Sequence, residues 1–304
     1  MTKTVLVLGA SGGFGCRAAE AFDAAGWEVR RYRRGTDIHS AAKGVDVIVN
    51  GQNPPMYHNW RVLVPQITAQ AIAAAKSSGA TLLVPGNVYV YGDTPGPWSE
   101  ATPHRFTARK SRIRSEMEAT YRRAVQEDGI RVILLRGGDF IDPENPATVM
   151  NMLILKRLKR NRMTRMGPMG TARAYAYLPD MARAAVALAE KRDTLSAYEE
   201  VNMPGLTFTL DAFRLEIGRQ TGRTPRVYAF PWWAMRLAAP FHELSRELLE
   251  MRYLYRTPHR MAGEAFDRLL PGFQETAFEE VVAREIAALV PDPRAPRATG
   301  RAAA

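Results

Sequence analysis

Short apolar runs alternate with longer amphipathic stretches through the first half of the chain. The runs predict β-strands at residues 4–8, 28–32, 45–50, 80–84 and 130–136. The stretches between them predict helices at 13–25, 57–78 and 107–128, followed by the C-cap glycines Gly26, Gly79 and Gly129. Strands that alternate with helices are typical of an α/β protein with a doubly wound parallel sheet.

The segment between the second and third predicted strands is short. Residues 34–44 read RGTDIHSAAKG, which leaves room for a single short crossover. A helix, a strand and a second helix do not fit there. The sequence therefore predicts that one strand-helix unit of the usual sheet is missing.

The pattern changes after Arg136. Asn145 and Pro146 suit the cap and first position of a helix, and Thr276 with Glu279 suits the capping box of another. Further helices are predicted at about 180–191, 210–221 and 277–289, with short strands near 200 and 226. We expect an N-terminal domain at 1–145, completed by part of 170–205, a smaller and mostly helical substrate lobe at 146–290, and a disordered tail at 291–304.

The glycine-rich stretch GASGGFG follows the first strand and opens the first helix. Gly9 permits the tight turn, Gly12 lets the backbone approach a pyrophosphate, and Gly15 lets the helix pack close to the strand. Gly13 and Phe14 share this loop, and Ser11 can add a hydroxyl to a phosphate. A dinucleotide in a Rossmann-type domain is the interpretation we favour, and a glycine-rich turn without a ligand is the alternative.

The chain carries a net charge of +11 and a single cysteine, Cys16. An excess of positive charge can serve to bind nucleic acid, a membrane surface or a phosphate-bearing ligand. Zinc-finger spacing, aromatic ribonucleoprotein motifs and basic helices with heptads are missing from the sequence, so we expect a solvated arginine-rich surface and neither a nucleic-acid nor a membrane partner. One cysteine excludes an internal disulfide, and a cytoplasmic location is the default expectation. We predict no metal site.

Several motifs together resemble the short-chain dehydrogenase/reductase superfamily, in its extended or atypical, NAD-dependent epimerase/dehydratase-like branch. They are the G-x-x-G-x-x-G spacing, GVDVIVNGQNPP at 44–55, VYVYGD at 88–93, TARKSRIRSEMEA at 107–119 and YAYLPDMARAAVALAE at 175–190. The resemblance implies that Gly51, Gln52 and Asn53 lie beside the cofactor.

The end of the second strand indicates which dinucleotide is bound. An acidic residue there holds the ribose 2'-hydroxyl of NAD, whereas the 2'-phosphate of NADP favours arginine. Glu28 lies too early in the strand, so Arg33 and Arg34 predict NADP(H) in preference to NAD(H), with a basic surface patch as the alternative. The resemblance implies that Asp37 and Ile38 border the adenine.

The usual chemistry of this superfamily uses a Ser or Thr, a Tyr as acid or base, and a Lys four residues after the Tyr. Counting back from Tyr91 puts Asn87 at the Ser/Thr position. Counting back from Glu116 puts Arg112 at the Lys position and Ala108 at the Tyr position. All three depart from the pattern, so the expected proton donor is missing.

Other residues are candidates to replace the missing chemistry. Asn87 can donate a hydrogen bond to a carbonyl, and Arg112 can bond ribose hydroxyls. Tyr89 and Tyr91 are the nearest candidate proton donors, and Tyr57 is a weaker one. His104 is expected to be a surface histidine of the loop before the third helix.

Two later segments carry unusual composition. Between Glu144 and Asp180 no acidic residue occurs among seven basic ones, which are Lys156, Arg157, Lys159, Arg160, Arg162, Arg165 and Arg173. The aromatic stretch FPWWAMRLAAPFHELSRELL at 230–249 is expected to pack in the core or lid of the lobe, or to form a homodimer contact. The alternative is a helix on a membrane surface.

The sequence thus predicts an NADP(H)-dependent oxidoreductase or epimerase-like enzyme with a non-standard active site. Its substrate would be a small carbonyl, hydroxyl or nucleotide-sugar-like compound in the cleft between domain and lobe. The alternative is a non-catalytic NADP(H) sensor or scaffold. Nucleic-acid binding through the positive charge is a third hypothesis.

Overall fold

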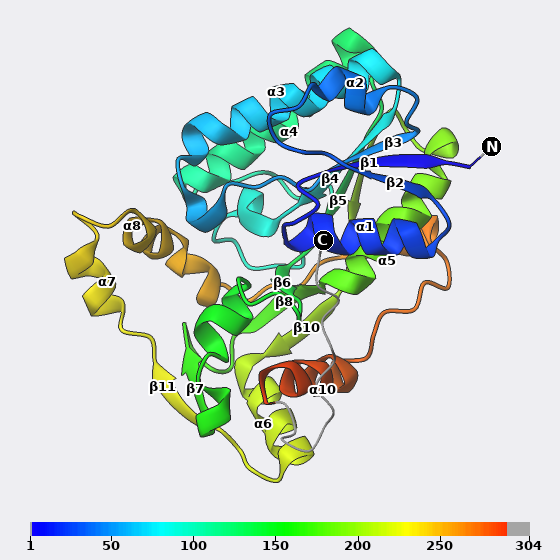
Figure 1. Cartoon of the computed structure of the whole chain (residues 1–304). Helices are drawn as coiled ribbons and strands as arrows, with labels where there is room; N and C mark the ends of the chain where they lie inside the picture. Colours follow the sequence, from blue (N-terminus) through cyan, green and yellow to red (C-terminus); the bar gives the residue numbers. More distant parts are fainter. Residues whose placement is uncertain (1, 291–304) are drawn as a thin grey trace.

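The computed structural model describes residues 2–290, so the prediction for the tail at 291–304 lies outside the described residues. Its centre is a parallel six-stranded sheet in the order β2-β1-β3-β4-β5-β9 (Figure 1). The strands are β1 (Thr4–Leu8), β2 (Glu28–Arg31), β3 (Val47–Asn50), β4 (Thr81–Gly86), β5 (Val132–Arg136) and β9 (Tyr198–Asn202). The doubly wound α/β fold is confirmed.

The crossover from β2 to β3 contains one short helix, α2 (Ile38–Ala42). Because β1 pairs with both β2 and β3, this crossover passes only one strand of the sheet. Asp37 caps α2, with its carboxylate accepting the amides of His39 and Ser40 at 3.1 Å each. The missing strand-helix unit is thus confirmed, and a capped five-residue helix stands in its place.

Helices cover both faces of the sheet (Figure 1). One face packs on α1 (Gly13–Ala24) and α5 (Leu178–Glu190), the other on α3 (Trp60–Ser78) and α4 (Arg109–Asp128). Alternation along β1 sends Val7 to the first layer with Phe22, and Leu6 to the second with Tyr121. Burial of each such side chain contributes roughly 1.5–3 kcal/mol.

The second lobe contains two small sheets beside its helices. In the first, β8 (Ala172–Tyr177) pairs with β6 (Asp139–Ile141) in parallel and with β10 (Leu206–Thr209) in antiparallel orientation. In the second, β7 (Arg162–Arg165) pairs with β11 (Arg226–Ala229) in parallel. The helices α6 (Leu210–Thr221) and α10 (Phe278–Leu289) pack beside them, and the chain returns to the large sheet in β9.

An arm formed by α7 (Trp232–Ala238) and α8 (Glu243–Glu250) extends from the lobe toward the sheet domain (Figure 1). The helix α9 (Glu264–Leu269) follows it. Short 3-10 turns occupy 55–57, 88–91, 158–160, 192–194 and 251–255. Over residues 2–290, no helix is both long and apolar enough to cross a membrane.

Two predicted helix caps are wrong, although α10 itself begins within one residue of the predicted start. Asn145 and Pro146 lie in a turn, and the following helical segment is a π-helix at Met150–Ile154, where Thr148 Oγ1 accepts the Asn151 amide at 3.1 Å. Thr276 does not cap α10, which begins at Phe278. Its amide and hydroxyl instead donate to Asp180 at 2.6 and 2.8 Å, a tertiary bond that sequence spacing does not reveal.

Candidate active site

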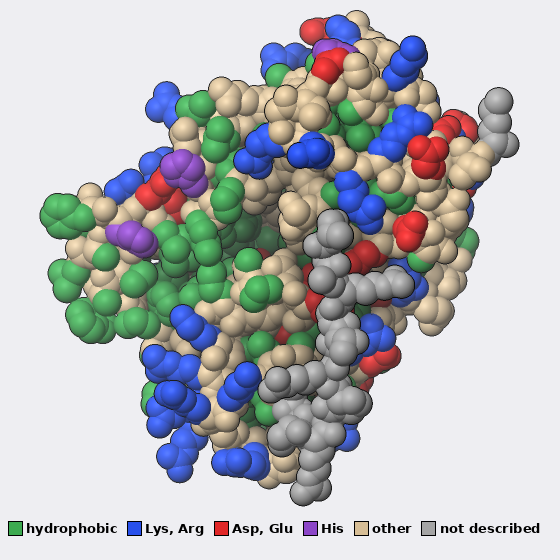
Figure 2. Space-filling model, in the orientation of Figure 1, with side chains coloured by type: hydrophobic (Ala, Val, Ile, Leu, Met, Phe, Trp, Pro, Cys, Tyr) green, Lys and Arg blue, Asp and Glu red, His purple; other side chains and the backbone are tan. Residues whose placement is uncertain are grey.

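A cavity of about 520 Å³ opens at the carboxyl ends of β1, β3 and β4. Its walls come from the glycine loop, the loops after β3 and β4, one face of α4, the start of the second lobe and two leucines of α8. Figure 2 shows the hollow between the upper and lower halves of the molecule. This is the place where ligands bind in open parallel sheets.

The glycine loop is compressed against the end of β3. Gly9 has a φ of 76°, and a Cβ on Gly15 would lie 2.2 Å from the Gly9 carbonyl oxygen. A Cβ on Gly51 would lie 2.7 Å from the Cα of Gly15. The helix α1 begins without a side-chain cap at Gly12, so its first amides remain available to an anion in the cavity. The loop therefore fits the diphosphate of a dinucleotide.

The structure brings most of the predicted cofactor residues into the cavity wall. These are Gly9, Ser11, Gly12, Gly13, Phe14, Arg34, Gly51, Gln52 and Asn53.

Four other predicted cofactor residues do not line the cavity. Gly15 lies behind Gly9, Arg33 is exposed beside Arg34, and Ile38 is buried in the core between α2 and the sheet. Asp37 is engaged as the cap of α2. In this short crossover Asp37 therefore caps a helix and Ile38 packs in the core, and neither borders the cavity.

The cation that α4 presents to the cavity is Arg114, and the structure does not bring Arg112 there. Arg112 is exposed, with its guanidinium 5.5 Å from the ring of Phe106. Arg114 is buried, donates to Asn53 Oδ1 at 2.7 Å and lies 4.6 Å over the ring of Trp60. Burial lowers the pKa of Arg114, because desolvation penalises its charged form.

The spacing along α4 explains the displacement. Lys110, Arg114 and Glu118 are four residues apart and all buried, whereas Glu116 is exposed. Counting from Glu118 puts Arg114 at the position of the family Lys and Lys110 at that of the family Tyr. This buried i, i+4 series is the signal in the sequence that would have identified Arg114.

Lys110 does not line the cavity. Its ammonium is paired with Glu247 and with Glu250 of α8, the latter at 3.1 Å. It also lies 4.8 Å over the ring of Tyr57. Position 110, where the family pattern has a tyrosine, therefore holds a buried lysine whose ion pairs connect α4 to α8.

Two tyrosine hydroxyls lie together in the cavity wall. Tyr89 follows β4, and its hydroxyl is 3.0 Å from that of Tyr57. Burial raises the pKa of both phenols, so both are protonated at neutral pH. Tyr89 is thus a protonated hydroxyl that can donate a hydrogen bond in the cavity.

Asn87 lies at the same end of β4 and also lines the cavity. Its Oδ1 accepts the amide of Tyr89 at 3.1 Å, which leaves the Nδ2 hydrogens as donors. Its carbonyl accepts the Arg136 guanidinium at 2.7 Å. Its position is therefore fixed from two sides.

Tyr91 is buried away from the cavity. Its hydroxyl donates to the Ser99 carbonyl at 3.2 Å and accepts from Asn202 Nδ2 at 3.0 Å. Its ring stacks on Trp98 with centroids 5.1 Å apart. These contacts indicate that Tyr91 has a structural role.

Arg136, Glu118 and Glu200 form a buried ion network that contacts the backbone of Asn87. Arg136 donates to both oxygens of Glu118 at 2.9 Å and to Glu200 at 2.6 Å. His104, predicted at the surface, is half-buried against Glu118, and burial lowers its pKa. His104, Glu118 and Glu200 offer ligand atoms within 4.8 Å of one another. Two arginines already pair with the carboxylates, Arg136 with both and Arg122 with Glu200, so the cluster is described as an ion network.

The second lobe adds a carboxylate to the cavity. Asp139 of β6 lines it and is paired with Arg173 of β8. Arg173 is buried, 4.4 Å over the ring of Tyr255, whereas the other members of its basic run are exposed. Asp139 was not predicted, because no motif surrounds it and only the pairing of β6 with β8 places it at the cavity.

The comparisons with known proteins agree with this geometry. Residues 5–203 match the NAD dependent epimerase/dehydratase family. A sequence search of curated proteins found no match.

Many solved structures share the fold. MoeE5 in complex with UDP-glucose and NAD has a TM-score of 0.74 at 16% identity, covering 94% of this chain and 98% of that one. The UDP-glucuronic acid 4-epimerase of Bacillus cereus, in complex with UDP-glucuronic acid and NAD, has a TM-score of 0.74 at 14% identity, with the same coverage. TunA, an NAD-dependent NDP-hexosamine 5,6-dehydratase of tunicamycin biosynthesis, has a TM-score of 0.73 at 16% identity, covering 94% and 97%. At these identities the likeness shows the fold alone.

Proposed function

Since this chain belongs to the NAD dependent epimerase/dehydratase family, we propose that it binds a nicotinamide dinucleotide and transfers hydride to or from a carbon that bears a carbonyl or hydroxyl, with Tyr89 as the proton donor. The observation that carries this proposal is the Tyr89 hydroxyl in the cavity wall, 3.0 Å from that of Tyr57. The bound nicotinamide would supply or accept the hydride.

The residues divide the work of carbonyl reduction as follows. Asn87 donates its Nδ2 hydrogen to the carbonyl oxygen and holds it beside Tyr89. As the carbonyl carbon gains a hydride, Tyr89 gives its proton to the oxygen, and the product is an alcohol. Tyr57 then passes its proton to Tyr89 through the bond between their hydroxyls and takes a replacement proton from solvent water, so that both phenols end protonated. Arg114 bonds the ribose hydroxyls, the role for which Arg112 was the first candidate.

The proposed substrate is a small hydroxylated compound of the nucleotide-sugar type. Support comes from polar groups of the second lobe in the cavity wall, which include Asp139, Asn145 and Thr148. Asn145 lies beside the glycine loop, since a Cβ on Gly13 would lie 2.7 Å from its Nδ2. All three side chains offer hydrogen-bond acceptors or donors to a hydroxyl-rich ligand. The neighbours solved with UDP-glucose and UDP-glucuronic acid make this class the first to test.

We further propose a preference for NADP(H). Arg34 lines the cavity, Arg33 is exposed beside it, and within residues 2–290 neither is in an ion pair. A 2'-phosphate would gain a charge-assisted bond, worth about 1.5–3 kcal/mol, that NADH cannot make. The double variant R33A/R34A should lose about tenfold or more in NADPH affinity by fluorescence titration and retain its NADH affinity. Arg31→Ala, which removes an exposed arginine outside the cavity, is the control; equal NADH and NADPH affinities in the wild type would exclude the preference.

Turnover tests the catalytic proposal directly. NADPH and NADH oxidation should be followed with carbonyl compounds and oxidised nucleotide sugars, for the wild type, Tyr89→Phe and the exposed control Tyr228→Phe. We expect Tyr89→Phe to lose roughly 10²–10⁴ in kcat with cofactor affinity intact. Wild-type turnover that survives in Tyr89→Phe would remove Tyr89 from the mechanism.

A non-catalytic dinucleotide sensor is the second candidate. The observation that favours it is Lys110, which occupies the family Tyr position and is bound to Glu247 and Glu250 outside the cavity. A sensor would bind NADPH without turnover of any compound in the panel. In that case the Tyr89→Phe variant would bind NADPH with the same affinity as the wild type.

A further inference from the structure

The helix α7 has an unusual surface for a helix of a globular lobe. All of its residues except Arg236 are apolar, yet none is buried. Trp233 is 69% exposed and Leu237 71%, and Phe241 just beyond the helix is 93% exposed. We call Trp233, Leu237 and Phe241 the apolar ridge. Core or lid packing, or a homodimer contact, was the expectation for this stretch; the structure leaves the apolar ridge exposed, and the homodimer contact stays a prediction.

The inner side of the arm accounts for this exposure. Glu247 and Glu250 of α8 face α4, where they pair with Arg109 and Lys110. Met235 of α7 contacts Ser245 of α8 through its sulfur at 3.6 Å. Trp232 at the start of α7 donates to the Met166 carbonyl at 2.9 Å and packs on the lobe. The arm is therefore held through α8 and Trp232, and the apolar ridge is left exposed.

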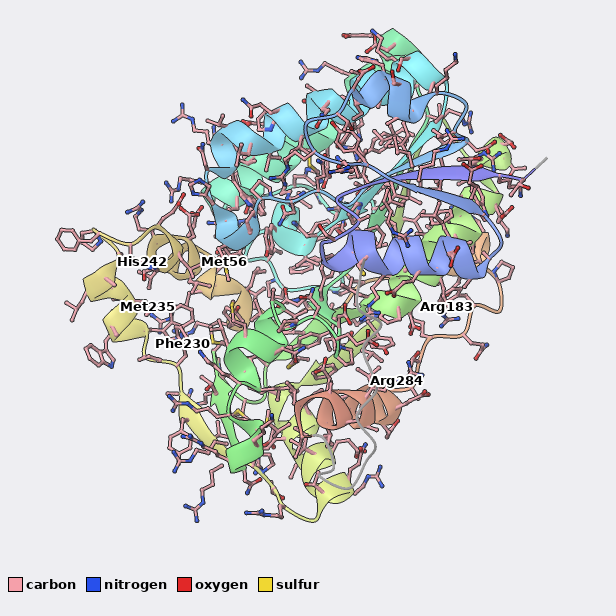
Figure 3. The ribbon with its side chains drawn as sticks, in the orientation of Figure 1. Met56, Arg183, Phe230, Met235, His242 and Arg284 are labelled. Atoms are coloured by element: carbon pink, nitrogen blue, oxygen red, sulfur yellow. The ribbon has the colours of Figure 1, made fainter. Side chains whose placement is uncertain are left out.

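The ridge is a local cluster and not scattered exposure. Trp233 and Leu237 are four residues apart on one face of α7, and Phe241 continues the same stretch. Figure 2 shows the hydrophobic side chains gathered over the arm. Figure 3 labels Phe230 just before α7, Met235 on α7 and His242 at the start of α8. An exposed apolar cluster of this kind marks an interaction site.

Exposed arginines flank the ridge. Arg162 and Arg226 lie opposite each other on β7 and β11, and Arg165 ends β7. The strand β11 leads directly into α7, which adds Arg236, and Arg256 follows the turn after α8. None of these five arginines forms an ion pair within residues 2–290. Figure 2 shows basic side chains gathered below the hydrophobic ones.

We propose that this face docks on an anionic lipid bilayer, with the apolar ridge inserted at the acyl boundary and the five arginines bound to lipid phosphates. A bilayer interface offers both chemistries side by side: apolar chains below and anionic headgroups above. A nucleic-acid surface would match the arginines but would leave Leu237 and Phe241 in water. A second copy of the chain would bring its own arginines against these, because a two-fold interface repeats the same surface.

The cavity lies next to the proposed contact. Leu244 and Leu248 of α8 line it, and so does Met56, which is 48% exposed at the rim. Figure 3 shows Met56 beside α8. Docking through α7 would hold the rim of the cavity near the lipid headgroups. The proposal rests on the surface alone and holds whether or not the cavity is catalytic.

Vesicle co-sedimentation of the full chain tests the proposal. Vesicles of phosphatidylcholine alone are compared with vesicles of equimolar phosphatidylcholine and phosphatidylserine. We expect at least about tenfold tighter binding to the anionic vesicles, weakened by high salt. The variant W233S/L237S/F241S should lose this binding. Leu215→Ser, which removes an apolar side chain 53% exposed on α6, should keep it.

The wild type and the triple variant also distinguish a bilayer from a second copy of the chain or a nucleic acid as the partner. Thermal unfolding of the triple variant at the wild-type temperature shows that the lost binding is not lost folding, since no ridge residue is buried. Failure of the wild type to bind anionic vesicles overturns the proposal. So does a wild-type dimer in light scattering that the triple variant converts to monomer without vesicle binding. Salt-sensitive retention on nucleic acid that the triple variant retains, in place of vesicle binding, overturns it as well.

Discussion

Replacing Arg136 with methionine removes the charge at the centre of the ion network beneath the cavity. The guanidinium is buried and makes four hydrogen bonds: two to Glu118 at 2.9 Å, one to Glu200 at 2.6 Å and one to the Asn87 carbonyl at 2.7 Å. Methionine has a comparable length, so its main effect is the loss of charge and hydrogen bonds. Glu118 then loses its arginine partner in a site with little access to water, whereas Glu200 keeps its ion pair with Arg122.

The expected cost follows from the stranded charge of Glu118. Removal of one partner from a buried ion pair costs about 3–5 kcal/mol, because the remaining charge stays desolvated. The sum of the four individual bonds would exceed this range, but bonds to the same charge are not additive. Out of a total stability of about 5–15 kcal/mol, the variant should remain folded with a clearly lower unfolding midpoint. The double variant E118Q/R136M removes the stranded charge and should recover part of the loss.

Urea unfolding at pH 7, followed by tryptophan fluorescence, measures the effect. Arg123→Met, which removes an exposed arginine of α4, should change the free energy of unfolding by no more than about 0.5 kcal/mol. A cost below about 1 kcal/mol for Arg136→Met would refute the reasoning. It would mean that Glu118 does not depend on this guanidinium for its burial.

Three further variants test other parts of the structure. Burial raises the pKa of Glu285 to about 8 from an ordinary 4.5. As the pH rises between those values, Glu285 ionises in the unfolded chain before it does in the folded protein, so the free energy of unfolding falls by up to about 1.4 kcal/mol per unit of pH. Glu285→Gln should therefore be more stable than wild type at pH 8 and equal to it near pH 4, and a difference that is constant with pH would contradict this. Burial lowers the pKa of His259 to about 4 from 6.5, so wild-type stability should fall as the pH drops through this window, and His259→Gln should flatten that part of the profile of unfolding free energy against pH. Gly15→Ala places a Cβ 2.2 Å from the Gly9 carbonyl and should cost about 1–3 kcal/mol together with dinucleotide affinity, whereas Gly170→Ala, with open space around its Cβ, should leave both unchanged in the same assays.

The buried sheet was predictable because central parallel strands are covered on both faces and therefore appear as plain apolar runs, such as Val5–Leu8. The missing unit was predictable from chain length alone, since residues 34–44 cannot reach across another strand. The small sheets were missed because β6 and β7 are three to four residues long and gain their pairing from distant strands. The glycine loop was local enough to locate, while Asp139 depended on tertiary pairing.

The exposure of α7 was not predictable, for the opposite reason. Its composition is that of a core helix, so hydrophobicity alone placed it inside the lobe or against another copy. Whether an apolar helix is covered depends on what already occupies the inner surface, and here the carboxylates of α8 occupy it. That information lies in the contact between α8 and α4, which are more than a hundred residues apart in the sequence.

Lys110 connects the altered site to the arm. The family pattern has a tyrosine at this position, whereas a lysine buried there requires counter-charges, and Glu247 and Glu250 supply them from α8. Those ion pairs hold α8 so that Leu244 and Leu248 close one side of the cavity and α7 is carried to the outside. This departure from the family pattern goes with two structural features: the position holds no phenol, and the ion pairs of its lysine hold the helix pair that presents the apolar ridge. Because the arm and the cavity wall depend on the same ion pairs, Lys110→Met should loosen the arm and change the cavity wall together, while the glycine loop and its dinucleotide contacts remain as they are.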